Sequence, residues 1–307
     1  MVIKSGGIAK ALLAVLAFSV PTVFVYRTDV DLSSPYPRAA ASERTAPAAP
    51  RDTVYVGVIS RYPSSVIYRG YQPVMDYLSS ATGRYFALRL GGSYEETVQQ
   101  LVHGRVSAAF LGAYLYVKAH EENGVVCIVQ PLNDDGAPSF RSLLITREGS
   151  NIRSLKDLEG RRVALPPELS YSANWLLTRA MPKAGLDFKS IGSVRHLPNH
   201  HAVVYELLRG NVDAAVVKDR VAREFVGRGV RVVATSDPIP GAPVVVAASH
   251  DAQLVADIRQ ALLGIKPRDP ATARLIATWD PEFANGFTAA RDADYNGLRL
   301  MLGLRVK

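Results

Sequence analysis

Cysteine, dense charge and long hydrophobic runs are all scarce in this chain of 307 residues. The single cysteine, Cys127, excludes an intramolecular disulfide framework and any zinc or iron–sulfur site built on several cysteines. It lies in the apolar run 125–129, which predicts a buried core thiol. The net charge of +8 is spread along the chain, and apart from Arg161-Arg162 it forms no cluster. No basic–aromatic motif accompanies it, so we expect no nucleic-acid partner.

Catalytic motifs are missing too. The chain has no G-x-S-x-G, no Walker loop and no G-x-G-x-x-G after a predicted strand. His196, His200 and His201 invite a metal site, but the first falls on a predicted strand and the other two open a helix. Their side chains should diverge, and no acidic or cysteine partner lies nearby. We expect neither an enzyme nor a metal or other cofactor.

The first 51 residues are predicted to lie outside the folded part. Lys4 and Lys10 precede sixteen uncharged residues, 11–26, a pattern typical of a secretion signal. That run is short for a membrane span, which needs about twenty residues, but Lys10 and Arg27 could reach the interface at its ends. Residues 1–26 therefore predict either a signal peptide or an uncleaved inner-membrane anchor. Residues 27–51, rich in Pro, Ala and Ser, predict a flexible tether, and the protein is expected in the periplasm or outside the cell.

Strand and helix patterns alternate from Thr53 onward. Runs rich in β-branched residues predict strands at 53–60, 85–90, 106–111, 125–130, 142–146, 162–165, 194–197, 213–217, 231–234 and 244–248. Segments of helical period predict helices at 72–82, 94–103, 114–122, 154–159, 172–183, 200–209 and 251–263, with Ser249 as N-cap of the last. This alternation predicts an α/β fold with a largely parallel sheet and helices on both faces.

Four predicted strands are followed by a short turn of small or polar residues and then by a helix. The helices begin at Tyr94, Tyr114, Ala173 and His200. Each helix start presents unpaired N–H groups and the positive end of a dipole, and in open α/β sheets these turns share the edge where ligands bind. Several such starts around one cleft would bind an anion.

An ordered series of segments resembles the phosphonate/phosphite/phosphate-binding proteins of ABC importers. The series is 104–112 with Tyr116-Val117, then 142–146, 154–160, 170–173, His200 before Ala202, 210–215, Pro240 and 292–295. The likeness covers about 55–302. It implies a type II periplasmic-binding-protein fold, in which two α/β lobes joined by two crossing segments close over a ligand. Lobe 1 would be 52–146 plus 241–307 and lobe 2 would be 147–240, with hinges near 146–147 and 240–242.

The family's ligand loop reads Ser-Thr-Ser-Gly, and here it reads Ser170-Tyr171-Ser172-Ala173. Both serines remain, so hydroxyl and N–H donors can still meet an oxyanion. The changes to Tyr171 and Ala173 add bulk and remove a hydroxyl, which bears on phosphonate specificity. A family aromatic position before the crossing strand falls on Phe140.

The other ligand positions that the resemblance implies lie on both lobes. The family histidine falls on His200, at a helix start where the dipole should lower its pKa. Family aromatic positions fall on Tyr94 and Tyr116. A family acidic position falls on Lys218, with Asp219 next to it. Lys218 in the cleft would favour a fully charged anion, and Asp219 one that keeps a proton to donate; the sequence leaves both open.

The resemblance implies a monomeric extracytoplasmic solute-binding protein. It would capture a small oxyanion by closure of its lobes and deliver it to the permease of an ABC importer. The alternative is a periplasmic ligand sensor on the same fold that acts on a membrane kinase or cyclase. The anchor-like N-terminus and the altered serine loop favour that alternative.

Overall fold

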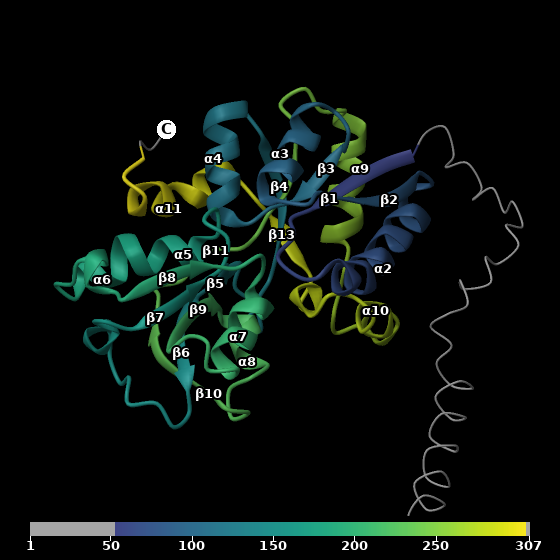
Figure 1. Ribbon diagram of the computed structural model, residues 1–307. Helices are drawn as coiled ribbons and strands as arrows, with labels where there is room; N and C mark the ends of the chain where they lie inside the picture. The colour runs from purple at the N-terminus through teal and green to yellow at the C-terminus, as the bar shows by residue number, and fades with distance from the viewer. Residues whose placement is uncertain (1–52, 305–307) are drawn as a thin grey trace, which may run out of the picture. The chain divides into compact units, whose positions relative to one another are not determined.

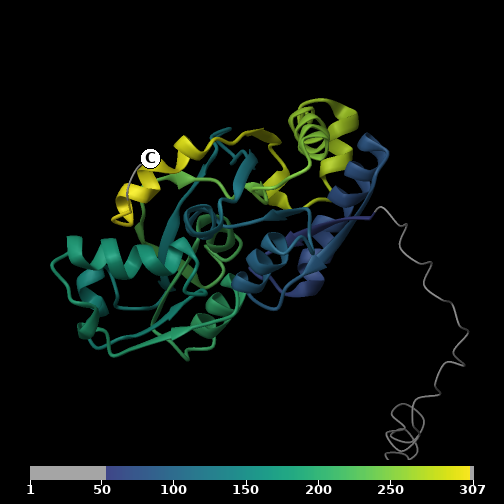
Figure 2. The same ribbon diagram turned by 90° about the horizontal axis from the view of Figure 1, so that it is seen from above.

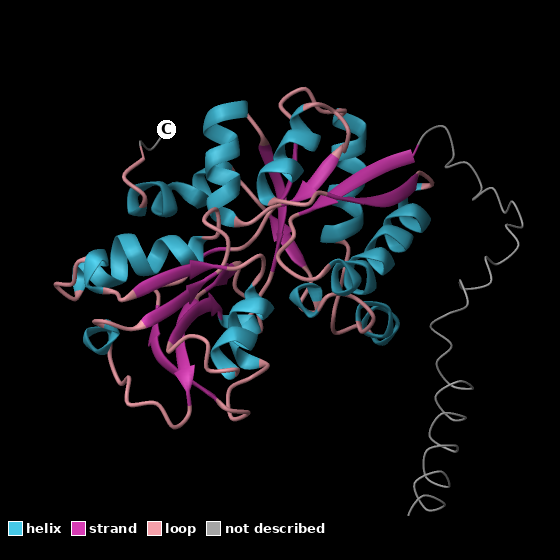
Figure 3. Ribbon diagram, viewed as in Figure 1, coloured by secondary structure: helices cyan, strands magenta, loops and turns pink. Residues whose placement is uncertain are grey.

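A computed structural model describes residues 53–304 of the chain (Figure 1). The predictions for residues 1–51, a signal peptide or anchor and a tether, lie outside the described residues. Within 53–304, no helix combines the length and the apolar character that a membrane crossing requires. Two large β-sheets organise this part of the chain, with helices packed around each of them, and a third sheet has two strands (Figure 3).

The first sheet has six strands in the order β13-β4-β12-β3-β1-β2. Their bounds are β1 Thr53–Val58, β2 Tyr85–Leu90, β3 Ala108–Phe110, β4 Val126–Pro131, β12 Val244–Val246 and β13 Phe287–Ala289. Its helices are α2 Ser64–Thr82, α3 Tyr94–Val102, α4 Ala113–Asn123, α9 Ala252–Leu263 and α10 Pro270–Ile276, with a 3₁₀ turn at Pro281–Phe283. We call these elements the first lobe.

The second sheet has five strands in the order β10-β6-β9-β7-β8. They are β6 Ser142–Arg147, β7 Arg162–Leu165, β8 Ser193–His196, β9 Ala214–Lys218 and β10 Val230–Thr235. Its helices are α5 Tyr171–Trp175, continued by a π-helical turn Leu176–Ala180 and α6 Met181–Lys183, then α7 His200–Leu208 and α8 Asp219–Arg223. Short 3₁₀ turns lie at Leu155–Leu158 and Phe188–Ser190. We call this the second lobe.

The chain passes between the lobes twice, and the two passages pair with each other. The outgoing strand β5 (Ser139–Phe140) and the returning strand β11 (Ile239–Pro240) form an antiparallel ribbon. The C-terminal helix α11 (Asn296–Met301), preceded by a 3₁₀ turn at Asp292–Tyr295, lies beside α5 of the second lobe in Figures 1 and 2. There the Tyr171 hydroxyl donates to the sulfur of Met301 at 3.7 Å. The α/β architecture of two lobes joined by two crossing segments is therefore the one expected.

The prediction of a largely parallel sheet is wrong, because both sheets are mixed. Strand β1 is parallel to β2 and β3, and β7 is parallel to β8 and β9. The remaining strand pairs are antiparallel. The physical reason is the crossing: β12, which follows the return from the second lobe, enters the first sheet between β3 and β4 and runs opposite to both.

Two helix starts also differ from the sequence expectation. Helix α2 begins at Ser64, not residue 72, and carries Pro73 in its interior. The burial of Ile67 and Tyr71 against the first sheet outweighs the hydrogen bond that the proline removes. Helix α9 is capped by Asp251 and not by Ser249, since the Asp251 carboxylate accepts from two backbone N–H groups of the first turn. The predicted core position of Cys127 is confirmed, for this thiol is buried beside β12.

Candidate functional site

A pocket between the lobes gathers residues from both of them. We call it the serine pocket; its lining residues are Ile59, Arg61, Tyr94, Gly112, Ala113, Phe140, Leu169, Ser170, Tyr171, Ser172, His200, Lys218 and Ala242. Three of the helix starts singled out in the sequence, those of α3, α5 and α7, supply lining residues. The fourth, that of α4, contributes its first residue, Ala113.

The predicted serine loop forms the start of α5 and is buried. The Ser170 hydroxyl caps this helix by accepting from the Ser172 backbone N–H at 3.3 Å. The Ser172 and Ser142 hydroxyls are hydrogen-bonded to each other at 2.8 Å. Ser142 opens strand β6, so this contact joins the loop to the second sheet. The loop therefore has a fixed position at the wall of the pocket.

His200 is held as a neutral ring. The Asn199 side chain caps α7 by accepting from the Ala202 N–H, which places His200 in the first turn. The His200 Nδ1 accepts a hydrogen bond from the Lys218 backbone N–H at 3.2 Å, so the ring proton resides on Nε2. Burial, helped by the positive charges of Lys218 and Arg61, lowers the His200 pKa to about 3. The direction agrees with the sequence expectation, but burial is the main cause.

A buried ion group connects the lobes beside the serine pocket. The Lys218 ammonium, at the end of β9 in the second lobe, lies 2.5 Å from the Glu282 carboxylate in the first lobe. Arg61 follows β1 in the chain, and its guanidinium pairs with the other oxygen of the same carboxylate. Burial alone would raise the pKa of Glu282, but the two cations hold it well below its usual range. Burial also lowers the pKa of Lys218, while Glu282 opposes this effect.

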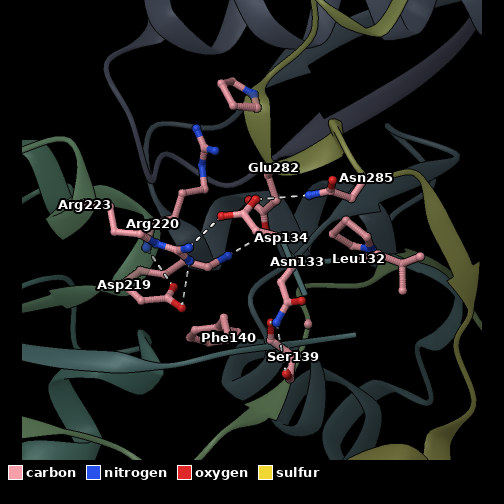
Figure 4. A pocket seen from close by; sticks show the side chains of 14 residues that line it. Leu132, Asn133, Asp134, Ser139, Phe140, Asp219, Arg220, Arg223, Glu282 and Asn285 are labelled. Atoms are coloured by element: carbon pink, nitrogen blue, oxygen red, sulfur yellow. Dashed lines mark hydrogen bonds and ion pairs between the residues drawn. The ribbon is translucent and has the colours of Figure 1, made fainter. Parts of the chain in front are cut away.

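The structure places Lys218 in the serine pocket and Asp219 outside it. The Lys218 ammonium lies 4.5 Å from the ring centre of Phe140, another lining residue. Asp219 faces a second pocket, where its carboxylate pairs with Arg223 at 3.3 Å (Figure 4). Its backbone N–H donates to the Arg141 carbonyl. Of the two alternatives from the sequence, Lys218 is the one that an anion in the serine pocket would meet.

The tyrosines predicted to bind the ligand do not all line the serine pocket. Tyr94 and Tyr171 line the serine pocket, and burial raises the pKa of both hydroxyls, that of Tyr171 to about 12. Tyr116 lies outside the pocket: its hydroxyl donates to Asp292 at 2.7 Å, and its ring packs edge-on against Tyr295 with centroids 4.6 Å apart. These contacts fix Tyr116 in the core of the first lobe, where it joins α4 to the C-terminal segment.

The second pocket, which is drawn in Figure 4 and which we call the charged pocket, shares lining residues with the serine pocket. Its polar lining residues are Asn133, Asp134, Ser139, Lys218, Asp219, Arg220, Arg223, Glu282 and Asn285. Arg223 of the second lobe pairs there with Asp134 of the first at 2.6 Å. Lys218 and Phe140 line both pockets, so the Lys218–Glu282 pair marks the boundary between them.

Sequence reasoning missed three polar residues around the serine pocket: Arg61, Ser142 and Glu282. Arg61 follows the first strand, so the rule that ligands bind at the carboxyl edge of a sheet could have found it. Ser142 carried no signal beyond its place at a strand start. Glu282 lies in a 3₁₀ turn far along the chain, and only the fold brings its carboxylate between Arg61 and Lys218.

Two lobes, a pocket between them, and hydroxyls, N–H groups and cations on its walls define a solute-binding protein of the periplasmic type. A family model described as "ABC transporter, phosphonate, periplasmic substrate-binding protein" matches residues 56–295. The chain belongs to this family, and it is a periplasmic substrate-binding protein of the ABC-importer type. The family favours this interpretation over the alternative of a ligand sensor with a kinase or cyclase partner.

Individual relatives agree with the family. The phosphate-import protein PhnD of Mycolicibacterium smegmatis is 25% identical over 274 residues, 81% of this chain and 84% of that protein. The binding component of an ABC phosphonate transporter from Pseudomonas aeruginosa superposes with a TM-score of 0.72 at 19% identity, covering 81% and 85% of the two chains. PhnD1 of Prochlorococcus marinus, solved with methylphosphonate, gives 0.72 at 15% identity and covers 81% and 97%. The likeness to these structures shows the type II periplasmic-binding fold.

Proposed function

We propose that this protein captures a small oxyanion of the phosphate, phosphite or phosphonate class in the serine pocket and delivers it to an importer permease. The observation that carries the proposal is the pocket itself. The starts of α5 and α7 meet there with Ser170, Ser172 and His200, and Arg61 and Lys218 add positive charge. The named ligands of two relatives, phosphate and methylphosphonate, belong to the same chemical class.

Each group has a distinct task in this proposal. The Ser170 and Ser172 hydroxyls and the N–H groups at the start of α5 donate to the anion oxygens. Neutral His200 donates from Nε2, because its Nδ1 is engaged by the Lys218 backbone. Lys218 and Arg61 supply charge-assisted bonds, each worth about 1.5–3 kcal/mol. Tyr94 and Tyr171 close the apolar side of the pocket, which excludes water from these bonds.

Closure of the lobes is the proposed signal to the permease. The proposed hinge is the β5–β11 ribbon: β11 lies beside the expected joint near 240–242, while β5 precedes the expected joint near 146–147 by six residues, because 146–147 end strand β6 of the second sheet. The proposed lobes are the expected ones, 52–146 plus 241–307 and 147–240, with the first boundary moved ahead of β6, because all of Ser142–Arg147 pairs within the second sheet. The chain acts as a monomer outside the cytoplasm. Residues 1–26 either direct its export and are then cleaved off, or stay in place as an anchor in the inner membrane. It binds and releases its ligand without covalent chemistry.

Isothermal titration of inorganic phosphate, phosphite and methylphosphonate into the purified protein tests the proposal. We expect at least one of these anions to bind, and Ser172→Ala and His200→Ala to weaken its binding by roughly ten- to a hundred-fold. The control is His201→Ala on the next residue of α7. The His201 ring pairs with Glu224 at 2.9 Å and packs on Tyr62, outside the serine pocket.

Two results would contradict the proposal. Equal losses for His200→Ala and His201→Ala would place the ligand outside the serine pocket, because consecutive helical residues point about 100° apart. No binding of any of the three anions would reject the proposed ligand class.

A further inference from the structure

The charge at the serine pocket comes from three buried side chains of both lobes. Arg61 and Lys218 line the pocket, and Glu282 lies behind them on the side of the charged pocket. The exposed fractions of the three side chains are 7%, 10% and 7%. Two positive charges and one negative charge leave a net charge of +1, shielded from water and salt.

Of the other charged groups near Glu282, Arg223 pairs with Asp134 at 2.6 Å and with Asp219 at 3.3 Å, and none of these three lines the serine pocket. Asp280 of the same turn pairs with Arg220 of α8 at 3.9 Å, so these two charges cancel. His200 of α7 is neutral. Tyr62 and Tyr94 remain protonated, because burial raises the pKa of both hydroxyls well above neutral pH.

We propose that Glu282 is a specificity-determining residue that makes the serine pocket prefer a singly charged oxyanion over a doubly charged one. The inference rests on the proposed function. With Glu282 in place, the first negative charge of a ligand meets a net charge of +1. A second negative charge meets a neutral site, gains no net attraction and still loses its hydration. Without Glu282, the second charge would be balanced by Arg61 and Lys218.

The size of the effect follows from the contacts. The Lys218 ammonium is 2.5 Å from the Glu282 carboxylate, and a ligand oxygen bound to that ammonium would lie about 2.8 Å from it. The ligand charge is then roughly 5 Å from the carboxylate. At an effective dielectric constant of about 20, removal of one charge at this distance changes the relative affinity for the doubly charged form by more than about tenfold.

Calorimetric titration at two pH values tests the inference on the full chain. Methylphosphonate loses its second proton as pH rises and so changes from its singly to its doubly charged form. A phosphate monoester makes the same change at about pH 6. Methanesulfonate keeps one charge throughout, so it reports any titration of the protein itself. Binding of both is measured at about pH 5.5 and about pH 8.5, for the wild type, for Glu282→Gln and for the control Glu224→Gln. Glu224 is an exposed carboxylate outside the serine pocket.

We expect the affinity of the wild type for methylphosphonate, relative to methanesulfonate, to fall at least tenfold from the lower to the higher pH. The ratio should stay level or rise in Glu282→Gln, while Glu224→Gln follows the wild type. A wild-type ratio that rises with pH would overturn the inference whether or not the variant folds, and so would equal trends in wild type and Glu282→Gln. Failure of both probes and of phosphate to bind at either pH would overturn the proposed function itself.

Discussion

Replacement of His200 by asparagine should remove a pH dependence of stability that only a buried neutral histidine produces. Burial and the charges of Lys218 and Arg61 lower the His200 pKa from 6.5 to about 3 in the folded protein. In the unfolded chain the ring regains its ordinary pKa. The unfolded state therefore binds a proton first as pH falls, so stability is present above about 6.5 and is lost progressively towards about 3. Asparagine keeps an acceptor near Nδ1 for the Lys218 N–H and carries no titrating group.

The magnitude follows from these two pKa values. At about pH 5 the unfolded state holds nearly one full proton on this ring, while the folded state holds almost none. The loss in free energy of unfolding between about pH 7 and about pH 5 is therefore about 2 kcal/mol. Glu282, whose folded pKa is depressed, contributes stability that is lost below its unfolded value of 4.5, so it adds little to the change in this window.

Urea unfolding at several pH values between these limits measures the effect. The wild type should lose about 2 kcal/mol more than His200→Asn over this range. The variant His201→Asn, on the neighbouring residue that pairs with Glu224, leaves the buried His200 ring in place and should keep the loss that this ring causes. A difference between wild type and His200→Asn below about 0.5 kcal/mol would refute the assignment of His200 as a buried neutral ring.

Two further predictions concern packing and closure. A Cβ added at Gly192 would lie 2.4 Å from the Gly160 carbonyl oxygen, so Gly192→Ala should lower the free energy of unfolding by roughly 1–3 kcal/mol. Gly149→Ala, where a Cβ meets no atom within 4 Å, is the control; equal stability of the two variants would contradict the packing argument. Small-angle scattering should give a smaller radius of gyration with saturating methylphosphonate than without it. An unchanged radius with a ligand that is shown to bind would contradict closure about the β5–β11 ribbon.

Local patterns in the sequence predicted the elements well where a strand or helix depends on its own residues. The helix start at Tyr94 follows the Ser93 cap, and the turn at Leu155–Leu158, inside the predicted helix 154–159, has a capping box of Ser154 and Asp157. Such caps act within one turn of chain, so the sequence contains all the groups involved. Strand direction was predicted less well. The antiparallel entry of β12 depends on where the chain returns from the second lobe, which no local pattern encodes.

The sequence by itself determined the α/β class and the helix starts around the serine pocket, and its resemblance to the family supplied the candidates Ser170, Ser172 and His200. Hydrophobic period, caps and turn residues are local, and helix starts at the carboxyl edge of a sheet converge by a general rule. Only the tertiary structure decided that Lys218, and not Asp219, faces the serine pocket, since successive residues at a strand end point in different directions. Only it brought Glu282 beside Lys218, 64 residues away along the chain. A buried charge depends on its neighbours in space, and the sequence does not list those neighbours.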